Sequence, residues 1–225
     1  MNVLERLRGV IVSIQPAADS VLNSPETVAL LARCAVANGA CGVRIEGPVR
    51  IAAVRAAVDV PIVGLLKRAY PGFEPYITPT AAEIEAVAAA GADVVAVDAT
   101  TRPRPGGFTF AAALAAIRGR GLIAMADCAT AAEMRAAAEA GAPIVATTLC
   151  GYTGDTRGAS LPALDLVPAA VASGAFTILE GGVASPDHVR RAFAAGASAV
   201  VVGTAISDID AQVRRFAQAA VQSHA

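Results

Sequence analysis

A short phrase, in which a small residue is followed by Gly-Ala and then by a run of apolar residues, recurs along the chain and constrains its fold more than any other feature. Alanine-rich stretches with helical periodicity precede it, as at residues 81–90 and 131–140. Each unit predicts a helix, a glycine that stops the helix, a tight turn and then a strand. The five copies of the phrase lie at residues 38–40, 90–92, 140–142, 173–175 and 195–197.

Three further apolar runs, at residues 9–14, 61–67 and 122–127, bring the number of expected strands to eight. Strands that alternate with helices predict βα units in a parallel sheet, and their continuous hydrophobicity indicates that both faces of the sheet are buried. Eight units of about 28 residues each fit an α/β fold of the (β/α)₈ TIM-barrel type. No linker divides the chain, so we expect a single domain over residues 1–225. A doubly wound open sheet is the alternative, weakened because no GxGxxG motif follows a strand.

The composition excludes several classes of protein. With 55% hydrophobic residues and a formal net charge of −1, the chain is too apolar to stay disordered and has no basic surface for nucleic acid. Each apolar run is shorter than the roughly 18 residues of a transmembrane helix. The first residues lack the basic region and long apolar stretch of a signal peptide. We therefore expect a cytoplasmic protein that binds neither nucleic acid nor a membrane.

No metal site or disulfide scaffold is expected. The cysteines form no CxxC pair and match no zinc-binding spacing, so they are expected to be reduced thiols, most of them buried. The two histidines lie on a late helix and at the penultimate position, which makes a poor metal site. These residues are Cys34, Cys41, Cys128, Cys150, His188 and His224.

Polar side chains gather at one end of the expected strands. In a (β/α)₈ barrel the chemistry lies at the carboxyl ends of the strands and in the loops that follow them. The opposite ends of these strands carry turn residues instead, an asymmetry that a purely structural barrel would not need. The polar set comprises Ser13, Gln15, Arg44, Glu46, Lys67, Arg68, Asp98, Thr100, Asp127, Thr147, Thr148, Glu180 and Thr204.

Lys67 is the only lysine in a chain that otherwise uses arginine for its cations. Arginine does not deprotonate in proteins, whereas burial can lower the pKa of a lysine toward neutrality. A lysine retained at a strand end is therefore a candidate proton carrier or Schiff-base nucleophile. The alternative is an ordinary ion-paired lysine.

Glu180 follows four apolar residues, where a carboxylate is costly unless it is paired or takes part in the chemistry. Across the barrel mouth from Lys67 it would complete an acid–base pair; the alternative is a structural ion pair with Arg44. Asp98 and Asp127 also end strands. One of them is a candidate acceptor for sugar hydroxyls, and the other a candidate for orienting Lys67.

Glycine-rich segments follow the seventh and eighth strands, where barrels often bind phosphate through backbone N–H groups. The candidate phosphate-binding residues are Gly181, Gly182, Gly203 and Thr204, and the alternative is a pair of tight turns. The loop at residues 149–158 is rich in glycine and carries Tyr152, which is typical of a mobile lid.

Several stretches taken together resemble the N-acetylmannosamine-6-phosphate 2-epimerase family of phosphosugar TIM barrels. The resemblance covers most of the chain, from Val10 to about Ile206, and its most specific parts are YITPT, DAT-x-RPRP and TTL-x-GYT. The matching stretches are GVRIEG (42–47), PIVGLLKR (61–68), YITPT (76–80), GADVVAVDATTRPRP (91–105), MADCAT (125–130), TTLCGYT (147–153), ILEGG (178–182) and AVVVGTAI (199–206).

The resemblance implies an isomerase that inverts C2 of N-acetylmannosamine 6-phosphate to give N-acetylglucosamine 6-phosphate, in sialic acid and amino-sugar breakdown. The ring-opened sugar would lose a proton on one face of C2 and gain one on the other, with Lys67 and Glu180 as the two catalytic groups. No redox cofactor and no metal are implied, and the implied assembly is a homodimer. Substrate binding would fall to Gln15, Arg44, Asp127 and Tyr152, and phosphate binding to Gly181, Gly182, Gly203 and Thr204.

The chain departs from the family pattern in two places. The first strand reads VSIQPAADS, where the family has a cysteine before the glutamine and Ala-Leu after it. After VVGTAI the chain continues Ser207-Asp208-Ile209-Asp210, where the family has an arginine that helps to clamp phosphate. Two acids at this turn disfavour a phosphate dianion, so an unphosphorylated amino sugar is an alternative substrate.

Two other functions are carried as alternatives. A Schiff-base aldolase would use Lys67 on the same barrel, and borohydride trapping would detect its imine. A phosphosugar-binding regulator on an inactive barrel is disfavoured because Lys67 and Glu180 are both present.

Overall fold

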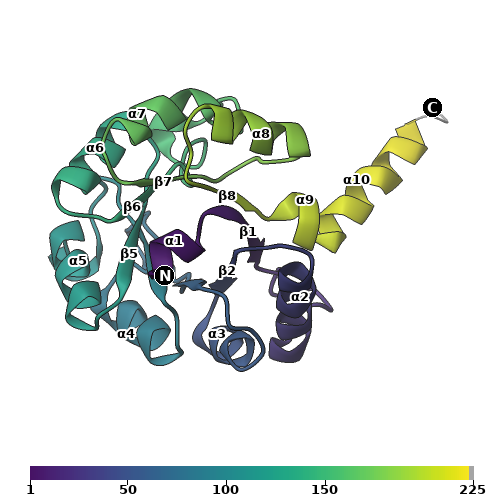
Figure 1. The fold of residues 1–225 in the computed structure, drawn as a ribbon, viewed down its shortest axis with the longest axis horizontal. Coiled ribbons are helices and arrows are strands. Elements are labelled where there is room, and N and C mark those ends of the chain that lie inside the picture. Colours follow the sequence, from purple (N-terminus) through teal and green to yellow (C-terminus); the bar gives the residue numbers. More distant parts are fainter. Residues whose placement is uncertain (223–225) are drawn as a thin grey trace.

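All eight predicted strands are present in the computed structural model, which describes residues 1–222 and leaves His224 outside the described part. They form a closed parallel barrel in chain order, and β8 pairs with β1 from Gly9↔Ala199 to Val12↔Val202 (Figure 1). The predicted single-domain (β/α)₈ barrel is therefore confirmed, and the open-sheet alternative is wrong. The strands are β1 Gly9–Ile14, β2 Gly42–Glu46, β3 Ile62–Leu65, β4 Val94–Asp98, β5 Ile123–Asp127, β6 Ile144–Ala146, β7 Phe176–Leu179 and β8 Ala199–Val202.

Helices pack around the outside of the barrel between successive strands (Figure 1). The α-helices are α1 Val3–Arg6, α2 Pro25–Ala37, α3 Pro48–Arg55, α4 Ala81–Ala89, α5 Phe110–Gly119, α6 Ala131–Glu139, α7 Val167–Val171, α8 Pro186–Ala194, α9 Thr204–Ser207 and α10 Ile209–Gln222. Single turns of 3₁₀ helix lie in the loops after β4 and β6, at Pro105–Gly107, Gly154–Thr156 and Leu164–Leu166.

The sequence marks the ends of these helices locally. Thr80 and Thr130 cap α4 and α6, each in a capping box with the glutamate three residues later. The glycines of the five recurring phrases all adopt positive φ angles just after a helix, a conformation that carries little cost only for glycine. These angles are 98° at Gly39, 93° at Gly91, 92° at Gly141, 78° at Gly174 and 99° at Gly196.

The core has two layers because successive side chains of a buried strand point to opposite faces of the sheet. In β4, Val94 and Ala96 pack inside the barrel with Met125, whereas Val95 and Val97 pack outward against the helices. This arrangement explains why the strands read as continuous apolar runs.

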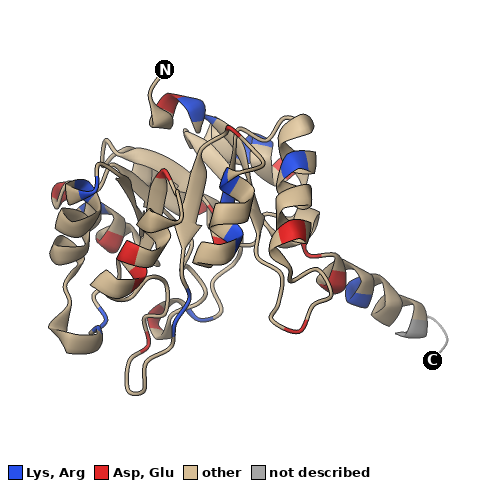
Figure 2. Ribbon diagram, turned by 90° about the horizontal axis from the view of Figure 1, so that it is seen from below, with Lys and Arg blue, Asp and Glu red and all other residues tan. Residues whose placement is uncertain are grey.

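The two ends of the barrel differ in character. Helix α1 covers the amino ends of the strands, with Leu7 fully buried in the interior cluster and Val3 and Leu4 packed against it. In the side view of Figure 2, the N-terminus lies at one end of the barrel, and α10 leaves toward the other end. The carboxyl ends of the strands are therefore the open end.

Helix α10 departs from the ring of helices and extends away from the barrel (Figures 1 and 2). It exposes Ile209, Val213 and Phe216, whose spacing places them on one face of the helix. Phe216 is 74% exposed, an unusual position for a large apolar side chain. Within residues 1–222, no helix combines the length and the hydropathy that crossing a membrane requires.

Candidate active site

A cavity of about 640 Å³ opens among the loops at the carboxyl ends of the strands. Nine of the ten site residues predicted from the sequence line it: Gln15, Arg44, Lys67, Tyr152, Glu180, Gly181, Gly182, Gly203 and Thr204. The tenth, Asp127, is fully buried and contacts the cavity only through Arg44 and Thr148. The barrel thus brings together residues that lie up to 189 positions apart in the chain.

A buried arginine organises the site. Arg44 on β2 is 1% exposed and its two terminal nitrogens lie 2.7 and 3.1 Å from the two carboxylate oxygens of Asp127. Its Nη1 also donates to Glu180 Oε2 at 2.8 Å. Burial alone would lower the pKa of Arg44, but the charges of Asp127 and Glu180 outweigh it and raise that pKa. The ion pair considered for Glu180 is therefore present.

Glu180 is held rigidly and is near its titration point at neutral pH. Its backbone N–H donates to Thr147 Oγ1 at 3.0 Å, and the Thr147 hydroxyl donates back to the Glu180 carbonyl at 2.8 Å. Burial, followed by the charge of Asp127, raises the pKa of the Glu180 carboxyl to about 7, against the lowering effect of Arg44. A carboxyl with this pKa can both hold and release a proton near pH 7.

Lys67 follows β3 at the base of a hairpin that folds over the cavity. Its backbone bridges to Ile77 on the returning arm, and its N–H donates to Glu46 Oε1 at 3.3 Å. Its side chain is accessible from the cavity, whose walls replace part of the surrounding water. This desolvation, followed by the positive charge of Arg44, lowers the pKa of Lys67, against the opposing effect of Glu180. Within residues 1–222 its ammonium makes no ion pair, which disfavours the reading as a structural lysine.

Gln15 offers an unused acceptor to the cavity. Its amide nitrogen donates to Ser13 Oγ at 2.8 Å, whereas its buried Oε1 has no hydrogen-bond partner among the described residues. A buried polar atom without a partner is costly, so a ligand that donates to Gln15 Oε1 would remove that cost.

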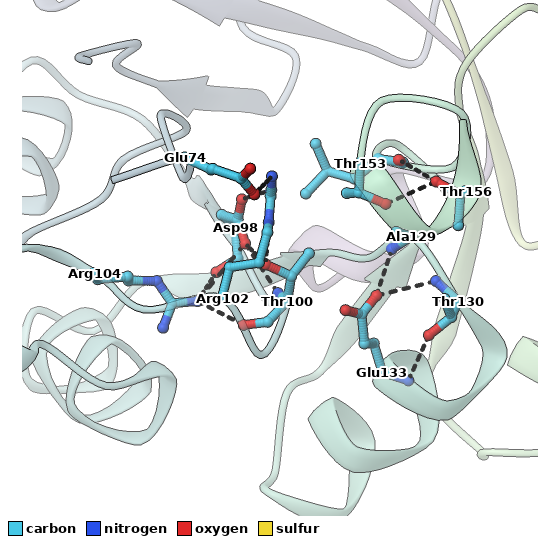
Figure 3. Close-up of polar contacts among 11 residues, drawn as sticks. Glu74, Asp98, Thr100, Arg102, Arg104, Ala129, Thr130, Glu133, Thr153 and Thr156 are labelled. Carbon is cyan, nitrogen blue, oxygen red and sulfur yellow. Dashed lines mark hydrogen bonds and ion pairs between the residues drawn. The ribbon is translucent and has the colours of Figure 1, made fainter. Parts of the chain in front are cut away.

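Asp98 does not belong to the site, contrary to the sequence-based expectation for this residue. Its carboxylate accepts from the Thr100 hydroxyl at 2.6 Å and from Arg102 Nη2 at 2.7 Å, and Arg104 donates to its backbone carbonyl (Figure 3). Figure 3 shows that the Arg102 guanidinium also pairs with Glu74, whose Oε2 lies 3.4 Å from Arg102 Nη1. Asp98 therefore neither accepts from a sugar nor orients Lys67; it fixes the loop after β4.

Glu46 and Arg68 are likewise committed to structural contacts. Glu46 pairs with Arg50 one turn along α3, and Arg68 pairs with Glu83 at 3.1 Å. Neither residue lines the cavity, although both follow strands at its open end.

The predicted phosphate-binding segments form one wall of the cavity. Gly181 and Gly182 have φ angles of 98° and 69°, and a Cβ atom on Gly182 would lie 2.4 Å from Cβ of Leu161. The loop after β6 therefore packs directly on this turn. Thr204 begins α9. Asp208 precedes α10 and caps it, because its Oδ1 accepts from the N–H of Ala211 at 2.8 Å.

The lining residues that were not selected from the sequence include three with polar side chains, Tyr76, Gln212 and Arg215. Tyr76 lies in the YITPT stretch, and only the hairpin geometry shows that it returns to Lys67. Burial, followed by the charge of Asp127, raises the pKa of Tyr76. Gln212 and Arg215 lie on α10, whose position no local pattern indicated.

No group of three or more His, Cys, Asp or Glu side chains in residues 1–222 is arranged to hold a metal ion. All four cysteines are free thiols, as expected, although only Cys128 and Cys150 are buried.

Comparisons with known proteins agree on one family. A family model described as "Putative N-acetylmannosamine-6-phosphate epimerase" matches residues 28–222. A "Putative N-acetylmannosamine-6-phosphate 2-epimerase" from Synechococcus elongatus is 47% identical over 221 residues, covering 96% of this chain and 95% of the relative. A "Bifunctional enzyme NanE/NanK" from Brucella melitensis is 45% identical over 207 residues, which cover 92% of this chain and 40% of that larger protein.

A solved structure gives the same result. The N-acetylmannosamine-6-phosphate 2-epimerase from Clostridium perfringens superposes with a TM-score of 0.93 at 31% identity, over 97% of this chain and 96% of that chain.

Proposed function

Because the chain belongs to the N-acetylmannosamine-6-phosphate epimerase family, we propose that it interconverts N-acetylmannosamine 6-phosphate and N-acetylglucosamine 6-phosphate. The reaction inverts the configuration at C2, and it would serve the breakdown of amino sugars such as sialic acid. It is an isomerisation with no net oxidation, so it needs no redox cofactor.

The chemistry follows from the structure of the open-chain sugar. Opening the ring exposes an aldehyde at C1, which acidifies the proton on C2 by delocalising the resulting negative charge. Inversion requires one group to remove that proton and another to deliver a proton to the opposite face. Two proton carriers that reach one cavity from different strands meet this requirement.

We assign these two roles to Lys67 and Glu180, which reach the cavity from β3 and β7 respectively. The lowered pKa of Lys67 and the raised pKa of Glu180, about 7, bring both groups toward the pH at which each can exchange a proton. The convergence of Lys67 and Glu180 from β3 and β7 on one cavity is the single observation that carries the proposal.

The remaining lining residues are assigned to binding. Gln15 Oε1 would accept from a sugar hydroxyl or the acetamido N–H, and Tyr152 on the loop after β6 would cover the sugar. Arg44 would hold the Glu180 carboxylate in place, and the buried Asp127 would hold the Arg44 guanidinium. Gly181, Gly182, Gly203 and Thr204 would bring backbone groups to the phosphate.

Conversion of the pure substrate tests the proposal. Proton NMR of N-acetylmannosamine 6-phosphate with the protein should show the signals of the N-acetylglucosamine epimer growing to equilibrium. Unphosphorylated N-acetylmannosamine, assayed in parallel, should react far more slowly. Turnover of the unphosphorylated sugar alone would contradict the proposed substrate, and covalent trapping at Lys67 by borohydride would favour the aldolase alternative.

We also propose a cytoplasmic homodimer. The assembly is supported by the apolar face of α10, formed by Ile209, Val213 and Phe216, which the barrel leaves uncovered. The location is supported by the phosphorylated substrate, which does not cross membranes unaided.

A further inference from the structure

The wall of the cavity that follows β8 contains a cation with no assigned partner. Three cationic side chains line the cavity: Arg44, Lys67 and Arg215. The Arg44 guanidinium is bound to two carboxylates, and Lys67 is one of the two groups proposed to act on C2. Among the described residues, no carboxylate is within ion-pairing distance of Arg215. Its charge is therefore available to a ligand.

The start of α10 is anchored so that one face of the helix borders the cavity. Asp208 caps the helix through the N–H of Ala211, and Gln212 Nε2 donates to the carbonyl of Thr204 at 2.8 Å. Ala211, Gln212 and Arg215 all line the cavity, and their spacing of three and four residues places them on the same face. The small side chain of Ala211 leaves room beside Arg215 for a bound group.

Asp208, one of the two acidic residues after β8, has a structural role as the cap of α10. Asp208 lines the cavity, and its carboxylate Oδ1 accepts from the N–H of Ala211 in the first turn of α10, where the helix dipole offsets part of its negative charge. Ser207 donates to the carbonyls of Ser13 and Gly203. Arg215, on the next turn of α10, is the one arginine or lysine among the described residues that line this wall.

We propose that Arg215 binds the phosphate group of the substrate and so selects the phosphorylated sugar. The proposal rests on the proposed function, because it takes the C2 end of the sugar to lie at Lys67 and Glu180. A guanidinium can donate two parallel hydrogen bonds to phosphate oxygens. It also carries a full positive charge, which the N–H groups of a backbone turn lack. Phosphate recognition is thus shared between the glycine turns after β7 and β8 and a side chain of α10.

The test compares two arginines that are adjacent on the same helix. Arg215 lines the cavity and Arg214 does not, so Arg215→Gln and Arg214→Gln make the same change of charge at matched positions. Arg215→Gln should raise KM for N-acetylmannosamine 6-phosphate roughly 5- to 50-fold, the range for an ionic hydrogen bond weakened by exposure to salt. It should leave kcat within about threefold, and KM should become less sensitive to ionic strength. Arg214→Gln should change neither quantity.

Binding of inorganic phosphate provides a readout that does not need turnover. Titration followed by calorimetry should show weaker binding to Arg215→Gln than to the wild type and to Arg214→Gln. If the wild type binds phosphate through Arg215 but does not convert the sugar, the proposed function fails and the assignment of Arg215 stands. Equal KM values and equal phosphate affinities in the two variants would overturn the assignment. A loss of affinity accompanied by a change of mass in light scattering would assign Arg215 to assembly and overturn it as well.

Discussion

At the scale of single residues, one arginine determines the properties of its neighbours. Arg44 is fully enclosed and carries two carboxylates, Asp127 and Glu180, so the three charges sum to a net negative charge in a buried place. The Asp127 carboxylate accepts two hydrogen bonds from the guanidinium and a short one from Thr148. The Glu180 carboxylate accepts one hydrogen bond from the guanidinium and a longer one from Thr148, so its negative charge is less well compensated and it can take up a proton.

The raised pKa of Glu180 should make the free energy of unfolding depend on pH. The pKa of Glu180 is raised from its ordinary value of 4.5 to about 7, so between these values the folded protein holds a proton that the unfolded chain has lost. Stability from this group is therefore fully present below pH 4.5 and is lost as the pH rises through 7. Compared with Glu180→Gln, which does not titrate, the wild-type free energy of unfolding should fall by up to roughly 3 kcal/mol between pH 4.5 and 8.

Urea denaturation of both proteins across that pH range measures the difference. Subtracting the two curves removes the contributions of other titrating groups that the proteins share. A difference that is flat with pH, or that rises, would show that Glu180 is ionised throughout and would remove the basis for its role as a proton carrier.

Much of the lining of the cavity could be predicted from the sequence. Lys67 was identifiable because it is the one lysine of the chain, and Glu180 because four apolar residues precede it. Asp98 has the same local signature as Asp127, a carboxylate at the end of an apolar strand. Only the structure distinguishes them, because Arg102 and Arg104 return to Asp98 from its own loop.

At the scale of elements, the site depends on how loops pack on glycine turns. The turn after β7 accepts the side chain of Leu161 from the long loop after β6, and there is no space for a Cβ on Gly182. That loop also carries Tyr152 into the cavity wall. The helix stops were predictable because each depends on a local glycine, whereas this packing joins segments about 20 residues apart and leaves no local pattern.

A pair of glycine variants separates backbone strain from this packing. Gly182 and Gly174 have similar φ angles of 69° and 78°, but nothing lies within 4 Å of a Cβ built on Gly174. Gly174→Ala should cost only the left-handed strain of roughly 1–2 kcal/mol. Gly182→Ala should cost a further ~1–3 kcal/mol from overpacking and should raise KM because the loop is displaced. Denaturant unfolding and steady-state kinetics measure both; equal losses of stability with unchanged KM would contradict the coupling of loop and site.

At the scale of the whole molecule, the regular alternation of helices and strands was enough to favour the closed barrel. Five glycine stops and eight apolar runs predict eight βα units, which fit a closed barrel, and the missing GxGxxG motif weakened the open sheet, which would also bury both faces. The course of α10 was not predictable, because an amphipathic helix can pack on its own barrel or on another surface. Gln212 and Arg215 were missed for that reason.

The exposed face of α10 makes a prediction about assembly. Ile209, Val213 and Phe216 form an apolar stripe on a helix that leaves the barrel, on a different face from Arg215. Light scattering should give twice the chain mass of 22.5 kDa for the wild type, and Phe216→Glu should shift the mass toward one chain. A wild-type mass of one chain, or an unchanged dimer in the variant, would show that this face is not the interface.

We propose that this barrel inverts C2 by removing and returning a proton, and that Lys67 is one of the two proton carriers. Proton NMR of N-acetylmannosamine 6-phosphate in D₂O tests it most directly, with wild type and Lys67→Ala side by side. We predict that the wild type forms the N-acetylglucosamine epimer with deuterium at C2. Lys67→Ala should be slower by at least ~10²-fold, the usual contribution of a general acid–base group. Epimer formed at the wild-type rate by Lys67→Ala, or formed by the wild type with the original hydrogen still on C2, would contradict the account.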